Sequence, residues 1–224
     1  MVFKYDPGIA CADLERSGCA HLKDILDDRF RDHLRNFYHR SRKDDANEQR
    51  NWKIAGKKRQ YLFDFPSRED TLEFRDGMSR LTGIAAEAFT ISERHLKVYE
   101  EGADPWPAPH KDRAASEISI GLPIAVAEGS TACVFPDFHV GPNTQERAIF
   151  LSSEEYGDVA NIYETENAVM LNEQFGDIIV FRGSAIFHER INAAGTAILY
   201  IKINRLGQDP LGENLFGCVV KGNA

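Results

Sequence analysis

Short runs of strand-forming residues, separated by turn-forming residues, dominate the chain from about residue 94 onward. Val, Ile, Phe, Tyr and Thr fill the runs, whereas Gly, Pro, Asn and Asp cluster between them, as they do between strands. The runs occupy residues 95–102, 116–126, 131–141, 148–153, 167–174, 177–183, 185–191 and 196–204. Because these runs follow one another without helices between them, the pattern predicts a β-sandwich or jelly-roll barrel, not a doubly wound parallel sheet.

The first third of the chain has a helical pattern instead. Residues 12–43 place apolar side chains at near-helical spacing among many charges. Residues 67–89 do the same, with Ser67 as the predicted N-cap. The polar residues 43–60 predict an exposed loop between the two helical segments.

The length of 224 residues favours one domain over two. We expect a single domain over 1–224 that is mainly β with flanking α-helices. Its parts are a mostly helical region at 1–93 that packs on the barrel, a jelly-roll core at 94–206 and a C-terminal tail at 207–224.

Composition limits the partners that such a protein can have. Lys and Arg number 27 against 35 Asp and Glu, so the net charge is −8, which disfavours a nucleic-acid binder with a basic face. No run approaches the roughly 18 apolar residues of a membrane-spanning helix. The N-terminal residues lack the apolar core of a secretory signal, and the four irregularly spaced cysteines are typical of free thiols. We therefore expect a cytoplasmic protein that acts on a small molecule, with its oligomeric state left open.

Two histidines and one aspartate are spaced as metal ligands can be. His110 and Asp112 lie two residues apart just before a predicted strand, so both side chains point the same way in an extended segment. His188 follows an apolar strand far along the chain. Two imidazoles and one carboxylate on one face of an octahedral metal leave positions open, as non-haem Fe(II) oxygenases require. The alternative is a turn at His110 and Asp112, with His188 hydrogen-bonded in the core.

Several motifs occur in an order that matches a known family. They are HKD at 110–112, GSTACVFPDFH at 129–139, GDIIVF at 176–181, His188 and Asn192. With them, residues 95–205 resemble the 2-oxoglutarate- and Fe(II)-dependent dioxygenases, in particular the phytanoyl-CoA-hydroxylase-like or clavaminate-synthase-like branch. The resemblance implies a double-stranded β-helix in which His110, Asp112 and His188 bind iron. It also implies a supporting role for His139 outside the metal shell.

The family holds the distal carboxylate of 2-oxoglutarate with a cation, usually Arg, because an unpaired buried charge is costly. The phytanoyl-like position, about ten residues after His188, holds Ile198 and Leu199 here. The clavaminate-synthase-like spacing leads to Lys202, fourteen residues after His188. The other candidates for cosubstrate binding are Arg205, Lys97, Tyr99, Thr196 and Ser119.

The resemblance implies an oxidoreductase that uses Fe(II), 2-oxoglutarate and O2 and releases succinate and CO2. Family halogenases replace the carboxylate ligand by a small residue, so the retained Asp112 predicts hydroxylation, desaturation or cyclisation. We expect a small polar substrate, such as an amino acid or a natural-product intermediate, with Arg190 as a candidate contact. Segments 55–66 and 141–166 are either lids over the pocket or plain packing segments.

Two other functions stay open on the sequence alone. A cupin-type metal enzyme would share the barrel without using 2-oxoglutarate, and three or more histidine ligands would favour it. A non-catalytic ligand-binding barrel is the second alternative. An intact triad disfavours that function, whereas the missing consensus Arg keeps it open.

Overall fold

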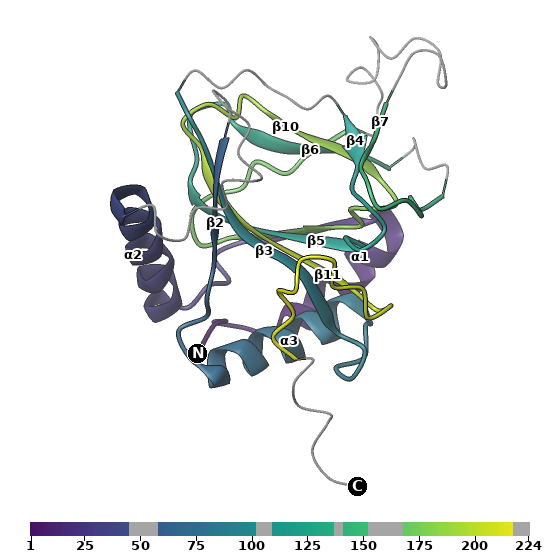
Figure 1. Ribbon diagram of the computed structural model, residues 1–224, viewed down its shortest axis with the longest axis horizontal. Helices are drawn as coiled ribbons and strands as arrows, with labels where there is room; N and C mark the ends of the chain where they lie inside the picture. The colour runs from purple at the N-terminus through teal and green to yellow at the C-terminus, as the bar shows by residue number, and fades with distance from the viewer. Residues whose placement is uncertain (45–57, 102–108, 137–140, 152–167, 217–224) are drawn as a thin grey trace, which may run out of the picture.

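Two antiparallel β-sheets that face each other form the body of the protein (Figure 1). The computed structural model describes residues 1–44, 58–101, 109–136, 141–151 and 168–216. From residue 90 onward the chain passes back and forth between the sheets, so that strands adjacent in sequence mostly lie in opposite layers. This alternation confirms the predicted jelly-roll architecture.

The larger sheet has six strands, and β11 lies near its centre. Their order is β1 (Cys19–Leu22), β9 (Ile178–Phe181), β5 (Ile118–Ala125), β11 (Ala197–Asn204), β3 (Thr90–Tyr99) and β2 (Lys58–Leu62). Strand β11 pairs with β5 on one side and with β3 on the other. Its register against β3 shifts between Lys202 and Ile203.

The smaller sheet has five strands. Their order is β7 (Ile149–Phe150), β4 (His110–Lys111), β10 (Phe187–Ile191), β6 (Thr131–Phe135) and β8 (Val169–Met170). In the pairing of β10 with β4, His188 lies directly opposite His110. The register of one strand pair therefore brings together two histidines that are far apart in the sequence.

Helices cover the outer side of the larger sheet, with α3 below it in Figure 1. They are η1 (Pro7–Ala10), α1 (Cys11–Ser17), α2 (Asp28–Asp44) and α3 (Arg68–Thr82). Ser67 caps α3 as predicted, because its hydroxyl accepts the Asp70 N–H at 3.1 Å. None of the helices within the described residues has the length and apolar character needed to cross a bilayer.

Strand β11 separates two apolar clusters of the interior. Leu199, Ile201 and Ile203 are buried in the larger cluster, together with apolar residues of the helices. Ile198 and Tyr200 belong to a second cluster with apolar residues of the smaller sheet. Each fully buried side chain of this size stabilises the fold by roughly 1.5–3 kcal/mol. The alternation along β11 thus directs its even-numbered side chains from Ile198 to Lys202 between the sheets, as the sequence predicts.

Two strands lie where the sequence predicts helix and loop. The helical segment 12–43 is interrupted because Gly18 ends α1 with a φ of 70°, after which β1 pairs with β9. The loop 43–60 contains the start of β2, which pairs with β3. Strand β3 begins at Thr90, before the expected start of the β core near residue 94.

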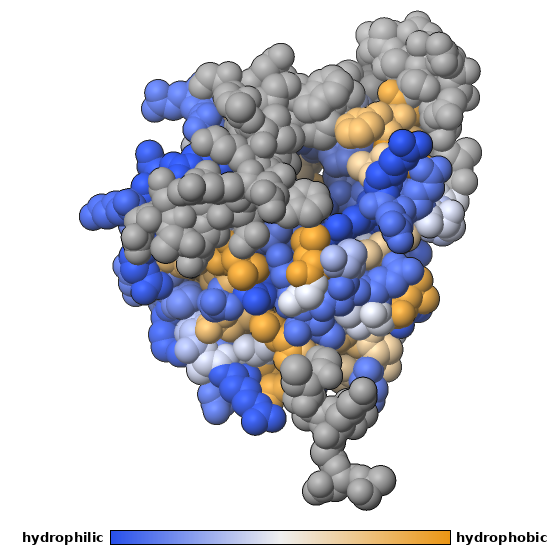
Figure 2. Space-filling view, in the orientation of Figure 1, coloured by the Kyte–Doolittle hydropathy of each residue, from blue (hydrophilic) through white to orange (hydrophobic). Residues whose placement is uncertain are grey.

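Hydrophilic side chains cover most of the described surface on the face shown in Figure 2, with apolar side chains in separate small groups. Single exposed apolar side chains are normal on folded proteins. The chemically distinctive side chains lie instead between the two sheets.

Candidate active site

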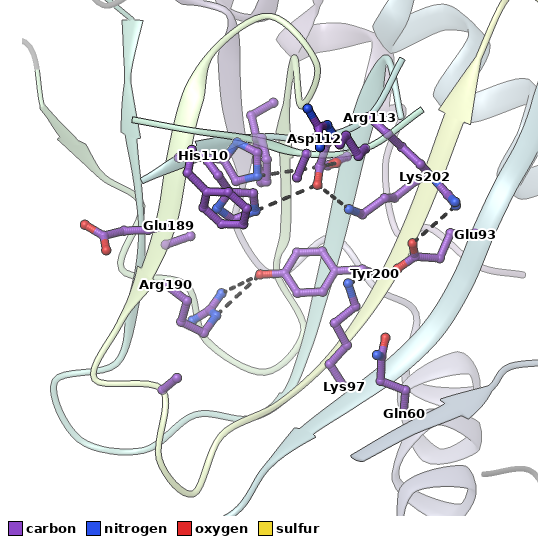
Figure 3. A pocket seen from close by; sticks show the side chains of 18 of the residues that line it. Gln60, Glu93, Lys97, His110, Asp112, Arg113, Glu189, Arg190, Tyr200 and Lys202 are labelled. Carbon is purple, nitrogen blue, oxygen red and sulfur yellow. Dashed lines mark hydrogen bonds and ion pairs between the residues drawn. The ribbon is translucent and has the colours of Figure 1, made fainter. Parts of the chain in front are cut away.

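A pocket of about 430 Å3 lies between the two sheets. A cavity of this size is suited to a small molecule. Its wall combines side chains that can bind metals, carry charge or donate hydrogen bonds, and these come from both sheets (Figure 3). They include Glu93, Lys97, Tyr99, His110, Asp112, Arg113, Ser119, His188, Arg190, Tyr200 and Lys202.

His110, Asp112 and His188 meet at one point of this wall. Nε2 of His188 is 3.5 Å from Oδ2 of Asp112, and Nε2 of His110 is 3.9 Å from Oδ1. One nitrogen or oxygen atom of each residue lies within 4.8 Å of those of the other two. One metal ion can bridge such a set, because its bonds to nitrogen and oxygen are about 2.0–2.2 Å long.

Backbone contacts place Asp112 beside the end of β9. Its N–H donates to the carbonyl of Gly183 at 2.8 Å, and its own carbonyl accepts from Nδ2 of Asn143 at 2.8 Å. A Cβ atom on Gly183 would lie 2.7 Å from Oδ2 of Asp112 and 2.5 Å from Oγ of Ser119. The backbone at residue 183 therefore approaches the carboxylate more closely than a side chain would allow.

His188 presents one defined nitrogen to Asp112. Its Nδ1 donates to the carbonyl of Ile186 at 3.0 Å, which assigns the lone pair to Nε2. Burial lowers the pKa of His188, although the charge of Asp112 opposes this effect. A neutral imidazole whose Nδ1 is held by a carbonyl is the form in which histidine binds metals. The donor set therefore fits a divalent metal.

Asp112 is charged and has a partner on each oxygen. Nζ of Lys202 donates to Oδ1 at 2.5 Å, and Oγ of Ser119 donates to Oδ2 at 2.7 Å. Burial would raise the pKa of Asp112, but the Lys202 ammonium and the histidines outweigh burial and hold the pKa well below its usual range. The site thus contains an ionised carboxylate that can bind a cation.

Glu93 collects further cations beside Asp112. Nζ of Lys97 lies 2.9 Å from Oε1 of Glu93, and Nη2 of Arg113 lies 3.6 Å from Oε2. Burial would raise the pKa of Glu93, but Lys97 and Lys202 lower it well below its usual range. Glu93 and Asp112 are therefore two carboxylates facing three cations, namely Lys97, Arg113 and Lys202.

Arg190 and Tyr200 meet across the pocket in Figure 3. Nη2 of Arg190 donates to the Tyr200 hydroxyl at 3.1 Å and also pairs with Glu173, whose side chain is fully buried. Nη1 of Arg190 donates to Oγ of Ser130 at 3.3 Å.

Burial raises the pKa of Tyr99 to about 12, so its hydroxyl remains protonated and can donate a hydrogen bond into the pocket.

Two of the residues considered for cosubstrate binding lie away from this wall. Thr196 is buried, and its hydroxyl accepts the Ala127 N–H at 3.1 Å. Arg205 lies beyond the end of β11, where its side chain is 53% exposed and its Nε donates to Glu117 at 2.7 Å. The structure therefore brings neither residue to the pocket, whereas Lys97, Tyr99, Ser119 and Lys202 do line it.

The candidate lids differ from each other. In segment 55–66, Tyr61 and Phe63 are fully buried in the core, which favours packing over a lid. In segment 141–166, Phe150 lines the pocket and its ring lies 5.6 Å from that of His110. Residues 152–166 of this segment, with the aromatic residues Tyr156 and Tyr163 that made it a candidate lid, lie outside the described residues, and so does His139.

Glu93 and Arg113 were not found by sequence reasoning. Residues 93, 97 and 99 share one face of β3 by simple alternation, so the signal for Glu93 was present in the sequence. Arg113 follows Asp112 directly, and nothing in its spacing indicates that it reaches Glu93.

Comparisons with known proteins bear on the fold. No protein-family model matches the sequence, and no curated protein sequence matches it significantly. Solved structures do match. The α-ketoglutarate-dependent epimerase SnoN from nogalamycin biosynthesis gives a TM-score of 0.60 at 14% identity, covering 88% of this chain and 80% of that chain. HygX from Streptomyces hygroscopicus gives 0.60 at 8% identity, covering 86% and 85%. EctD from S. alaskensis gives 0.56 at 15% identity, covering 90% and 78%.

This is the fold of the Fe(II)/2-oxoglutarate oxygenases. The structural match with SnoN covers 88% of this chain, which is more than residues 95–205 alone. The similarity in fold therefore includes the N-terminal helices. The position of this chain within either branch named above stays a prediction.

Proposed function

We propose that the protein is an Fe(II)- and 2-oxoglutarate-dependent oxygenase. It would convert a small polar molecule to a hydroxylated, desaturated or cyclised product, with succinate and CO2 as co-products. The observation that carries this proposal is the meeting of His110, Asp112 and His188 in a pocket between the sheets of an oxygenase fold. SnoN has been solved with Fe3+ and α-ketoglutarate, and HygX with nickel and 2-oxoglutarate, which supports the proposal.

His110, Asp112 and His188 would hold Fe(II) through two nitrogens and one oxygen and leave other positions open. Fe(II) with 2-oxoglutarate and O2 supplies the oxidation of an unreactive C–H bond. The protein fixes the ligands: the Ile186 carbonyl orients His188, and Ser119 orients Asp112.

Lys97 and Lys202 are the residues we propose for the distal carboxylate of 2-oxoglutarate. With Arg113 they outnumber the two carboxylates of that wall, so an added carboxylate would balance the charge. The protonated Tyr99 hydroxyl would donate a hydrogen bond to the same group. A polar substrate is favoured because Arg190, Tyr200 and Glu189 line the remaining wall.

Spectroscopy under anaerobic conditions tests the proposal. Protein mixed with Fe(II) and 2-oxoglutarate should develop the weak visible charge-transfer band of chelated iron. The variant His188→Ala should lose the band, whereas His21→Ala, which removes a histidine paired with Asp177 away from the pocket, should keep it. Metal binding without the band would favour the cupin-type enzyme. Neither metal binding nor a band would favour a non-catalytic barrel.

A further inference from the structure

One oxygen of the proposed carboxylate ligand is bonded to an ammonium group. Nζ of Lys202 lies 2.5 Å from Oδ1 of Asp112, while the neutral hydroxyl of Ser119 donates a hydrogen bond to Oδ2. A hydroxyl is compatible with a metal on the same carboxylate, but an ammonium and a divalent cation repel each other. The side chain of Lys202 is only 10% exposed, so solvent screens this repulsion weakly.

A second carboxylate lies next to Lys202. Glu93 is its cross-strand neighbour in the pairing of β11 with β3, and both side chains point into the pocket in Figure 3. Oε1 of Glu93 receives no aligned hydrogen bond from the described residues, although Lys97 approaches it to 2.9 Å. Lys202 can therefore leave Asp112 and still face a negative charge. In that position, however, three cations share Glu93.

We propose that Lys202 is a stand-in cation for the metal and that it couples metal binding to cosubstrate binding. It neutralises Asp112 until a divalent metal takes this role, and it then turns toward Glu93 and the distal carboxylate of 2-oxoglutarate. This inference rests on the proposed function. When a metal binds alone, Lys202 moves next to Lys97 and Arg113, where the three cations exceed the single negative charge of Glu93. When 2-oxoglutarate also binds, its negative charge balances this excess. By linkage, each ligand strengthens the binding of the other, and Lys202 contributes to this factor.

Calorimetric titration with Mn(II) tests the inference on the metal-stripped 224-residue chain. Without 2-oxoglutarate, Lys202→Met should bind Mn(II) about tenfold more tightly than the wild type, because no ammonium has to leave Asp112. With saturating 2-oxoglutarate, this advantage should disappear. Equal or weaker binding of Mn(II) alone by Lys202→Met would overturn the inference.

Arg147→Met is the matched control. It also removes a cation that lines the pocket, but one whose Nε donates to Gln145 and which pairs with neither Asp112 nor Glu93 among the described residues. We expect its affinity for Mn(II) alone to stay within about twofold of the wild type, a difference well below the usual size of coupling between sites. Tightening equal to that of Lys202→Met would assign the effect to general pocket charge and contradict a specific role of Lys202.

The outcomes separate this inference from the proposed function. If neither the wild type nor Lys202→Met binds Mn(II), both fail. If the wild type binds Mn(II) and forms the visible band with Fe(II), but Lys202→Met shows no tightening, only the inference fails. If the variant does not fold, a crystal structure of the wild type with Mn(II) decides. Lys202 beyond hydrogen-bond distance of Asp112 supports the inference, and Lys202 still bonded to Asp112 overturns it.

Discussion

Gly183 contributes to the site through its lack of a side chain. A Cβ atom there would press on both Asp112 and Ser119. We therefore expect Gly183→Ala to lower the affinity for Mn(II) about 10- to 100-fold, as disturbing the support of a metal ligand usually does. Calorimetric titration measures this loss.

Gly121→Ala is the control for Gly183→Ala. Its Cβ would lie 2.8 Å from Cγ1 of Ile179, so the substitution also strains the interior but does not reach the triad. It should lower the melting temperature and leave the affinity for Mn(II) unchanged. Unchanged affinity in Gly183→Ala would show that the carboxylate tolerates displacement.

Arg190 and Glu173 form a buried ion pair beside the pocket. Removing one partner leaves the other charge buried and unpaired, which costs about 3–5 kcal/mol. We expect Arg190→Met to lower the free energy of unfolding by this amount in urea denaturation. The double variant Arg190→Met/Glu173→Gln should recover most of the loss. A small effect of the single variant would mean that Arg190 serves ligand binding without supporting the fold.

At the level of secondary structure, Asp177 connects two elements of the larger sheet at the start of β9. Its carboxylate pairs with Nε2 of His21 at 2.8 Å and accepts the N–H groups of Asp24 at 2.8 Å and Gln174 at 2.9 Å. Asp177→Asn would turn an amide donor toward these donors, so we expect a loss of about 1–3 kcal/mol in the free energy of unfolding. The exposed Asp32→Asn should change it by less than about 0.5 kcal/mol. Equal losses of unfolding free energy in Asp177→Asn and Asp32→Asn would contradict the proposed role of Asp177 in connecting β1 and β9.

The sequence predicts the β core of this protein better than its edges. Strand β11 is readable because eight residues alternate between a helix-facing and a pocket-facing side. Strand β1 has four residues and forms only because β9 offers it an edge, which is information that no local pattern contains. The run 196–204 does predict the end of β11 at Asn204, but it does not show that Arg205, just beyond that end, pairs with Glu117 away from the pocket.

The candidate site, like the fold, could be predicted only in part. His110, Asp112 and His188 could be predicted because their residue types and order are distinctive. The ion pair of Lys202 with Asp112 could not, since it depends on how β11 lies across from the segment after β4. Alternation along a strand predicts which way a side chain points, but not which charge lies opposite it in another layer.

For the whole molecule, stability should depend on pH through its buried carboxylates. Burial opposes their ionisation, yet paired cations hold the pKa of Asp70 and Glu93 below the ordinary value, and hydrogen bonds from His21 and backbone N–H groups do so for Asp177. Groups whose pKa is lowered on folding stabilise the protein above their unfolded pKa, near 4, and this contribution is lost as the pH falls through the folded pKa. We expect the free energy of unfolding to fall steadily below about pH 4 in urea titrations.

Burial lowers the pKa of His188, which adds an effect of the same sign at higher pH. Because the unfolded state takes up this proton first, stability should already begin to decline below about pH 6.5. The variant Asp177→Asn should show a shallower acid decline than the wild type. Stability that is unchanged or rises between pH 5 and pH 3 would contradict these assignments.

Strands β1 and β2 close the two opposite edges of the larger sheet, and both come from the first 62 residues. A shortened protein starting at β3 would leave two rows of backbone amides and carbonyls unsatisfied, which invites aggregation. The N-terminal region is therefore an integral part of the fold, and a chimera that replaces it must supply both edge strands of the larger sheet in register.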